Sequence, residues 1–164
     1  MTQEAQTRSL WELRAVLIAA LAAGALSFNL LLFVVPFFLG GSCWIMMRVL
    51  ASILLGEGVL APPASFDAGL FAAGLAAQLL LSFIYTFVLS FIIHRWGLVT
   101  GILLGAFFGA CFYALNLHVF TLWLPWLFTL NHWSVFAVHV LFGMTAGGVY
   151  ELLDTDVPSV PRPL

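Results

Sequence analysis

The chain has 164 residues, of which 63% are hydrophobic and only 7% are charged. A soluble domain needs far more charge on its surface, so the composition predicts an integral membrane protein. Its expected partner is the lipid bilayer that surrounds it. The net charge is -2 and there is no lysine, so no basic surface exists for phosphates and no nucleic acid is expected as a partner.

The length limits the number of spans. A bilayer core of roughly 30 Å needs roughly 20 apolar residues per helix, so this chain suffices for four spans with short connections and no separate soluble domain. We therefore expect a single transmembrane domain over residues 1–154. The proline-rich tail, residues 155–164, is expected to be disordered.

The first apolar segment covers about residues 13–39. Arg8 and Arg14 lie at its start, and its first half has the small residues of a signal peptide. The apolar run is too long for a cleaved signal, so we interpret it as an uncleaved first span.

Local signals predict where this first helix begins and ends. Ser9 and Glu12 have the spacing of a capping box, which predicts a start near Leu10. Gly40-Gly41 predicts the end, and Pro36 predicts a kink in the last turn.

The next segment, about residues 42–60, allows two topologies because it is apolar but carries Arg48 near its middle. If it spans, Arg95 and Arg162 lie opposite the N-terminal arginines. If it lies in the interface or re-enters, all four of these arginines share one side. The positive-inside rule favours the second topology, with both termini cytoplasmic.

Three further spans are expected at about residues 68–93, 97–120 and 134–153. The residues between the last two spans include three tryptophans, a proline and no charge, a composition expected at the headgroup level. The predicted fold is an all-α membrane protein, a four-helix transmembrane bundle with an additional interfacial or re-entrant helix.

Glycines recur every four residues along the third predicted span, and the fourth span continues the pattern. Helices in a bilayer associate through close backbone approach, so this glycine zipper predicts that the third and fourth spans form the tightest pair. The predicted helix-packing residues are Gly97, Gly101, Gly105, Gly109, Gly143 and Gly147.

A polar stripe, Gln78, Ser82 and Tyr85, lies on one face of the second predicted span. Each polar group in hydrocarbon needs a partner. The favoured interpretation is hydrogen bonding between helices, to Asn29 or Asn116. The alternative is the headgroup of a bound substrate or quinone.

No catalytic motif is present, and the interiors of the predicted spans contain no aspartate, glutamate or lysine. An enzyme or a proton-coupled pump is therefore not expected. Histidine and sulfur side chains are expected near the outer face, and they would suit copper or haem iron. Hydrogen bonding is favoured over a cofactor, and the pattern does not identify a metal. The candidate cluster comprises His118, His132, His139, Asn116, Cys43, Met46 and Met47.

Several short motifs resemble small, uncharacterised bacterial inner-membrane proteins of the YagU-like kind. They are the run RVLASILLG from Arg48, Phe66-Asp67, the glycine-rich third span, Leu124-Pro125-Trp126 and the run HVLFG from His139. The resemblance covers residues 48–150. It implies a bacterial inner-membrane location but no activity and no site residues.

Three functions are compatible with these features. The leading hypothesis is a structural or accessory subunit of a larger membrane complex, such as a respiratory or redox assembly, with other integral membrane subunits as partners. The second is a metal- or haem-binding membrane protein that uses the histidine cluster. The third is a small channel or facilitator that forms oligomers through the glycines of the third span.

Overall fold

The computed structural model describes residues 3–94 and 96–154, with side chains from residue 13 onward, and every regular element in these ranges is helical. The predicted tail at 155–164 lies outside them. The long helices are α1 (Gln3–Asn29), α4 (Ala68–Ile93), α5 (Leu98–His118) and α6 (Trp133–Asp154). The short ones are η1 (Leu30–Val34), α2 (Val35–Leu39), α3 (Cys43–Leu55), η2 (Glu57–Leu60), η3 (Phe120–Leu122) and η4 (Pro125–Leu130).

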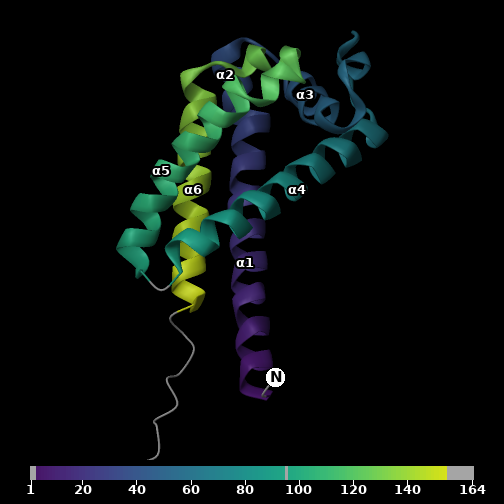
Figure 1. Ribbon diagram of the computed structural model, residues 1–164. Coiled ribbons are helices and arrows are strands. Elements are labelled where there is room, and N and C mark those ends of the chain that lie inside the picture. The colour runs from purple at the N-terminus through teal and green to yellow at the C-terminus, as the bar shows by residue number, and fades with distance from the viewer. Residues whose placement is uncertain (1–2, 95, 155–164) are drawn as a thin grey trace, which may run out of the picture.

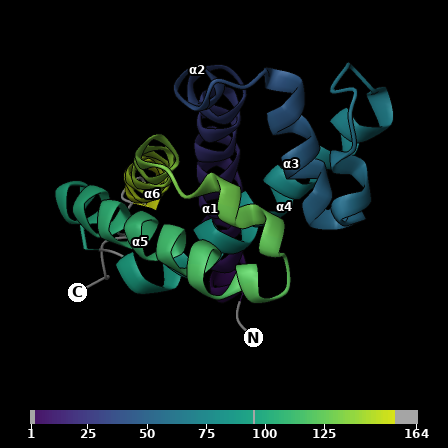
Figure 2. The same cartoon turned by 90° about the horizontal axis from the view of Figure 1, so that it is seen from above.

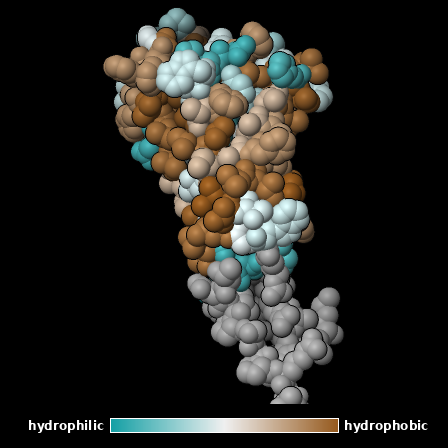
Figure 3. All heavy atoms as spheres, turned by 90° about the vertical axis from the view of Figure 1, so that its left-hand side faces the viewer, coloured by the Kyte–Doolittle hydropathy of each residue, from teal (hydrophilic) through white to brown (hydrophobic). Residues whose placement is uncertain are grey.

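Four helical stretches of the described chain are long and apolar enough to cross a membrane. They are residues 13–39, 68–93, 98–122 and 133–154, and they occupy the ranges predicted for spans. On the face made largely by α5, hydrophobic residues form a broad band with hydrophilic residues towards both ends (Figure 3). The 13 residues of α3 reach only about 20 Å, too short to cross the apolar core.

The long helices alternate in direction along the chain. The beginning of α1 and the end of α6 lie at the same end of the molecule (Figure 1). The helix α4 crosses the middle of α1 obliquely and packs against α3 near its own start, whereas α5 and α6 lie side by side. An even number of long helices thus returns the chain to the end where it started.

The start of α1 differs from the prediction. The helix begins at Gln3, so Ser9 lies inside it and the expected start near Leu10 is wrong. The preceding residues are mostly good helix formers such as glutamine, glutamate, alanine and arginine, and no proline or glycine stops the helix there.

The last part of the first span is irregular, as Pro36 predicts. A π-helical turn, η1, directly precedes α2, which has Pro36 in its first turn. Proline lacks a backbone N–H and clashes with the carbonyl four residues earlier, and a π-turn relieves this conflict. Gly40 then ends the helix in the left-handed conformation, with φ of 70°.

Glycines bring α5 and α6 into backbone contact, and this contact is the most extensive between two helices. A Cβ added to Gly105 would collide with the carbonyl oxygen of Gly143, and the reverse is equally true. Gly109 packs in the same way against the carbonyl oxygen of His139, and Gly147 against that of Gly101. The helices can approach this closely only because these positions lack side chains.

This contact changes two expectations about the glycines. Gly97 does not take part in it, because no atom of the described chain lies within 4 Å of a Cβ added there and its φ of 88° belongs to the turn before α5. The glycine groove is filled by α6 of the same chain. It is therefore not free to join a second copy, as the channel hypothesis assumed.

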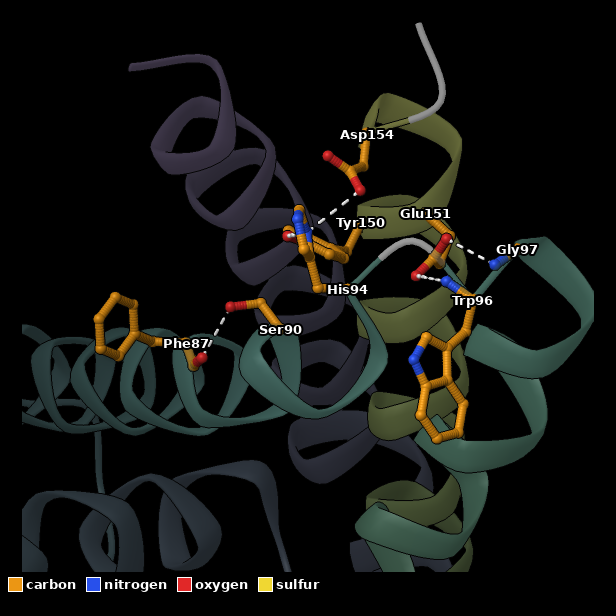
Figure 4. Close-up of polar contacts among 8 residues, drawn as sticks. All are labelled: Phe87, Ser90, His94, Trp96, Gly97, Tyr150, Glu151 and Asp154. Atoms are coloured by element: carbon orange, nitrogen blue, oxygen red, sulfur yellow. Dashed lines mark hydrogen bonds and ion pairs between the residues drawn. The ribbon is translucent and has the colours of Figure 1, made fainter. Parts of the chain in front are cut away.

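A buried carboxylate holds the turn between α4 and α5 (Figure 4). Glu151, which has 0% exposure, accepts hydrogen bonds from the backbone N–H of Gly97 at 2.9 Å and of Trp96 at 3.3 Å. The first N–H groups of a helix have no carbonyl partner within it, and negative charge is favourable at this end. Glu151 on α6 thus satisfies the start of α5.

A second contact joins the end of α4 to α6 in the same region (Figure 4). The Nδ1 atom of His94 lies 2.9 Å from the Tyr150 hydroxyl oxygen and 3.3 Å from the Asp154 carboxylate. Neither His94 nor Glu151 belongs to the candidate sites that the sequence indicated. Both side chains in fact join helices at the end of the molecule where the described chain starts and stops.

Candidate functional site

A cavity of about 230 Å³ lies between the helices, on the side of the molecule away from the described chain ends. Most of its lining is aliphatic or aromatic, and no lining residue is charged. An engineered cavity of about 150 Å³ holds benzene, so this one has room for a molecule of roughly ten non-hydrogen atoms. The polar lining residues are Ser27, Gln78, Ser82, Tyr85, Tyr113, Asn116 and His139.

The α4 wall of the cavity carries the predicted polar stripe. The side-chain amide of Gln78 donates to the Ser27 hydroxyl at 2.7 Å and to the Ser82 hydroxyl at 3.4 Å. Ser27 in turn donates to the carbonyl oxygen of Gly24 at 3.1 Å. The stripe therefore hydrogen-bonds to α1.

The partner on α1 is not the predicted one. Asn29 donates to the Ala25 carbonyl of its own helix at 2.8 Å, and Ser27 takes its place beside Gln78. Residues two positions apart lie on different faces of a helix, so only one of them can face α4. The small Gly24 allows this approach, because a Cβ there would come within 2.8 Å of the Ser82 hydroxyl oxygen.

A hydrogen-bonded chain crosses the cavity from α4 to α6. The Tyr85 hydroxyl donates to the Asn116 side-chain oxygen at 2.6 Å, and the Asn116 amide nitrogen lies 2.9 Å from Nε2 of His139. Nδ1 of His139 is 2.8 Å from the carbonyl oxygen of Val135, which can only accept. The proton therefore sits on Nδ1, and Nε2 of a neutral imidazole accepts from Asn116.

The segment expected at the headgroup level covers the cavity. Leu124, Leu127 and Leu130 of this segment line it, together with Phe120, which directly precedes the segment. Figure 2 shows η3 and η4 between the end of α5 and α3. The Trp126 indole N–H donates to the Ser52 hydroxyl on α3 at 2.9 Å, and Ser52 has 0% exposure. We call residues 120–130 the roof.

The structure does not gather the predicted metal or haem ligands. His139 uses both ring nitrogens within the protein, and Nδ1 of His132 lies 2.8 Å from the Ser134 hydroxyl. His118 is exposed in the last turn of α5. Met46 lines the cavity and Met47 packs against Gly74, whereas Cys43 is only partly buried, at the edge of the apolar cluster that contains both methionines. Over residues 3–94 and 96–154, no group of three or more His, Cys, Asp or Glu side chains is placed to hold a metal.

Comparison with protein-family models, with curated proteins and with solved structures finds no match to this chain. The resemblance to YagU-like proteins therefore stays a prediction from short motifs. The cavity has to be interpreted from its own residues. Among them, Ser27 and Tyr113 had no signal in the sequence, because a lone hydroxyl within an apolar run does not reveal what it faces.

Proposed function

We propose that this protein is a multi-pass membrane protein that binds one small, uncharged molecule inside its helical bundle. The observation that carries the proposal is the cavity of about 230 Å³, with an apolar lining and a few hydrogen-bonded polar groups. Binding sites for small molecules commonly combine a mostly apolar concave surface with a few fixed polar groups. A molecule dissolved in the bilayer would match this lining.

The proposed placement in the membrane follows from the arginines. Positive residues favour the cytoplasmic side, which puts both termini there. A bacterial inner membrane is what the resemblance to YagU-like proteins implies. The cavity and its roof then lie towards the outer leaflet, with α3 in the interface. Reaction with a membrane-impermeant reagent at single cysteines in α3 and in the α4–α5 turn tests this orientation.

The cavity is tested by binding of para-propyltoluene, an apolar probe of the right size. Equilibrium dialysis of the protein in lipid nanodiscs, against empty nanodiscs, separates binding from partition into lipid. We expect saturable binding by the unaltered protein. No saturable binding would overturn the proposal.

Two neighbouring leucines on α4 provide the matched variants. Leu81 lines the cavity, whereas Leu80 is 50% exposed on the outside. Leu81→Trp should fill the cavity and abolish binding, and Leu80→Trp should leave binding unchanged. Val138→Phe, on the α6 side of the cavity, gives an independent filling variant, and circular dichroism checks that each variant folds.

The roles expected from the sequence stay hypotheses beside this proposal. Purification in mild detergent with a stoichiometric membrane partner would support an accessory subunit, and a coloured or metal-containing preparation would support a cofactor protein. An oligomeric channel would need a contact surface other than the glycine face of α5, because α6 of the same chain packs on that face.

A further inference from the structure

We infer that the cavity selects a molecule with a hydroxyl group on an otherwise apolar body, that is, an alcohol or a phenol of roughly ten non-hydrogen atoms. This inference rests on the proposed function and names the ligand class of the same site. It follows from which hydrogen-bonding atoms of the polar lining are already used and which are free.

Gln78 offers the ligand an acceptor. Both of its amide protons have acceptors, in Ser27 and Ser82. Over the described residues, no donor bonds to its side-chain oxygen. Among the described residues, the side-chain polar atoms that are both solvent-inaccessible and without a hydrogen-bond partner are Arg48 Nε and Thr86 Oγ1, so the Gln78 oxygen is not one of them. The Gln78 oxygen is therefore not fully buried, and since Gln78 is a lining residue of the cavity, we assign this oxygen as the acceptor that the cavity offers.

The hydroxyl protons of the two tyrosines that line the cavity also have acceptors within the protein. The Tyr85 hydroxyl donates to Asn116 at 2.6 Å, and the Tyr113 hydroxyl lies 3.2 Å from the Asn131 side-chain oxygen and 3.4 Å from the His132 carbonyl. Each phenolic oxygen can still accept a hydrogen bond. His139 and Ser27 likewise donate within the protein.

Few donors remain for the ligand. They are the Ser82 hydroxyl proton and the second amide proton of Asn116. A hydroxyl group on the ligand both donates to the Gln78 oxygen and accepts from Ser82. A carbonyl or an ether can only accept, so it would leave the Gln78 oxygen without a donor.

Charge on the ligand is excluded by the same lining. No lining side chain carries a charge that could balance a carboxylate or an ammonium group. Burying an unpaired ion in apolar surroundings is far more costly than burying a hydrogen-bonded hydroxyl. The ligand is therefore neutral.

The test compares three probes with the same apolar body in the nanodisc dialysis: para-propylphenol, para-propyltoluene and para-propylbenzaldehyde. The phenol can donate, the toluene has no polar group and the aldehyde can only accept. We expect the phenol to bind roughly fivefold or more tightly than either of the others, the difference that one hydrogen bond gives.

Variants on α4 then locate the acceptor. Gln78→Met removes the amide at nearly constant length and should abolish the preference for the phenol over the toluene and the aldehyde. Thr86→Val removes a hydroxyl of the same helix that does not line the cavity, and it should change nothing. Circular dichroism reports whether the Gln78 variant folds. If it does not, the ranking of the three probes on the unaltered protein decides whether the cavity prefers a hydroxyl group.

The outcomes separate this inference from the proposed function. If all three probes bind equally, or the aldehyde binds best, the hydroxyl preference is overturned and the cavity stands as an apolar site. If none binds, both the inference and the proposed function fail. A preference for the phenol that survives in a folded Gln78→Met variant overturns the assignment of the acceptor.

Discussion

Tyr85 on α4 donates a hydrogen bond of 2.6 Å to the side-chain oxygen of Asn116 on α5. The two rings Tyr85 and Phe112 also stack, with centroids 3.8 Å apart. Apart from such side-chain contacts, α4 and α5 contact each other little, because α5 packs mainly on α6. Tyr85 therefore joins two helices across the cavity.

Removal of the Tyr85 hydroxyl should destabilise the fold modestly. Tyr85→Phe keeps the ring but leaves the Asn116 oxygen without its donor, which should cost about 1 kcal/mol of unfolding free energy. Unfolding in mixed micelles, followed by circular dichroism, measures this. In a double-mutant cycle with Asn116→Leu the two losses should not add, and fully additive losses would show that the bond contributes nothing.

The glycine contact between α5 and α6 should not tolerate a methyl group. Gly105→Ala places a Cβ against the Gly143 carbonyl, so the backbones must separate, at a cost of about 1–3 kcal/mol. Gly58→Ala is the matched control, because nothing lies within 4 Å of its added Cβ and its φ is not positive. Equal stability of the two variants in the same unfolding assay would contradict the packing described.

The Glu151 carboxylate should be needed for the start of α5. Glu151→Ala leaves the N–H groups of Trp96 and Gly97 without this acceptor, and we expect a loss of about 2–3 kcal/mol. Glu151→Gln keeps one acceptor oxygen and should lose less. Leu141→Ala, at a 42% exposed position on the same helix, is the control. If Glu151→Ala were no less stable than this control, Glu151 would not cap α5.

Removal of the Thr86 hydroxyl, in contrast, should not destabilise the fold. Its hydroxyl is buried at 1% exposure and has no hydrogen-bond partner among the described residues, so Thr86→Val, which keeps the shape, should be neutral or stabilising by up to about 1 kcal/mol. Ser27→Ala, which removes the acceptor of Gln78, should destabilise in the same assay. A loss of stability in Thr86→Val would mean that the hydroxyl has a partner.

The roof should loosen when its anchor is removed. Trp126→Phe loses the N–H that bonds to Ser52, at a cost of about 1 kcal/mol, while the aromatic ring stays. Hydrogen–deuterium exchange should rise in residues 120–130 and stay unchanged in the α5–α6 contact. Trp123→Phe, at a 69% exposed position, is the control. Equal exchange in both variants would show that Trp126 does not hold the roof.

The long helices and the glycine contact could be predicted because their signals are local. The length of an apolar run gives a span, and glycines four residues apart give a face, whatever the rest of the chain does. The pairing of Tyr85 with Asn116 was one of two alternatives that followed from the polar stripe. These features needed no knowledge of how far each helix rotates about its axis.

The cavity, its roof and the roles of Ser27 and Glu151 could not be predicted in this way. The choice of Ser27 over Asn29 depends on the rotation of α1 against α4, which the sequence of neither helix contains. The tryptophans of residues 121–133 are typical of a headgroup segment, yet the indole N–H of Trp126 also bonds to Ser52 on α3. The role of Glu151 depends on the packing of α6, which brings its carboxylate beside the first turn of α5.

The most direct test of the central claim is a crystal structure grown from lipid in the presence of para-bromophenol, whose bromine is located by its anomalous scattering. Our account predicts a bromine peak inside the cavity beneath the roof, with the hydroxyl group at the Gln78 oxygen, and no such peak in the Leu81→Trp variant. Bromine found only on the lipid-facing surface, with the cavity empty or filled by water, would contradict it.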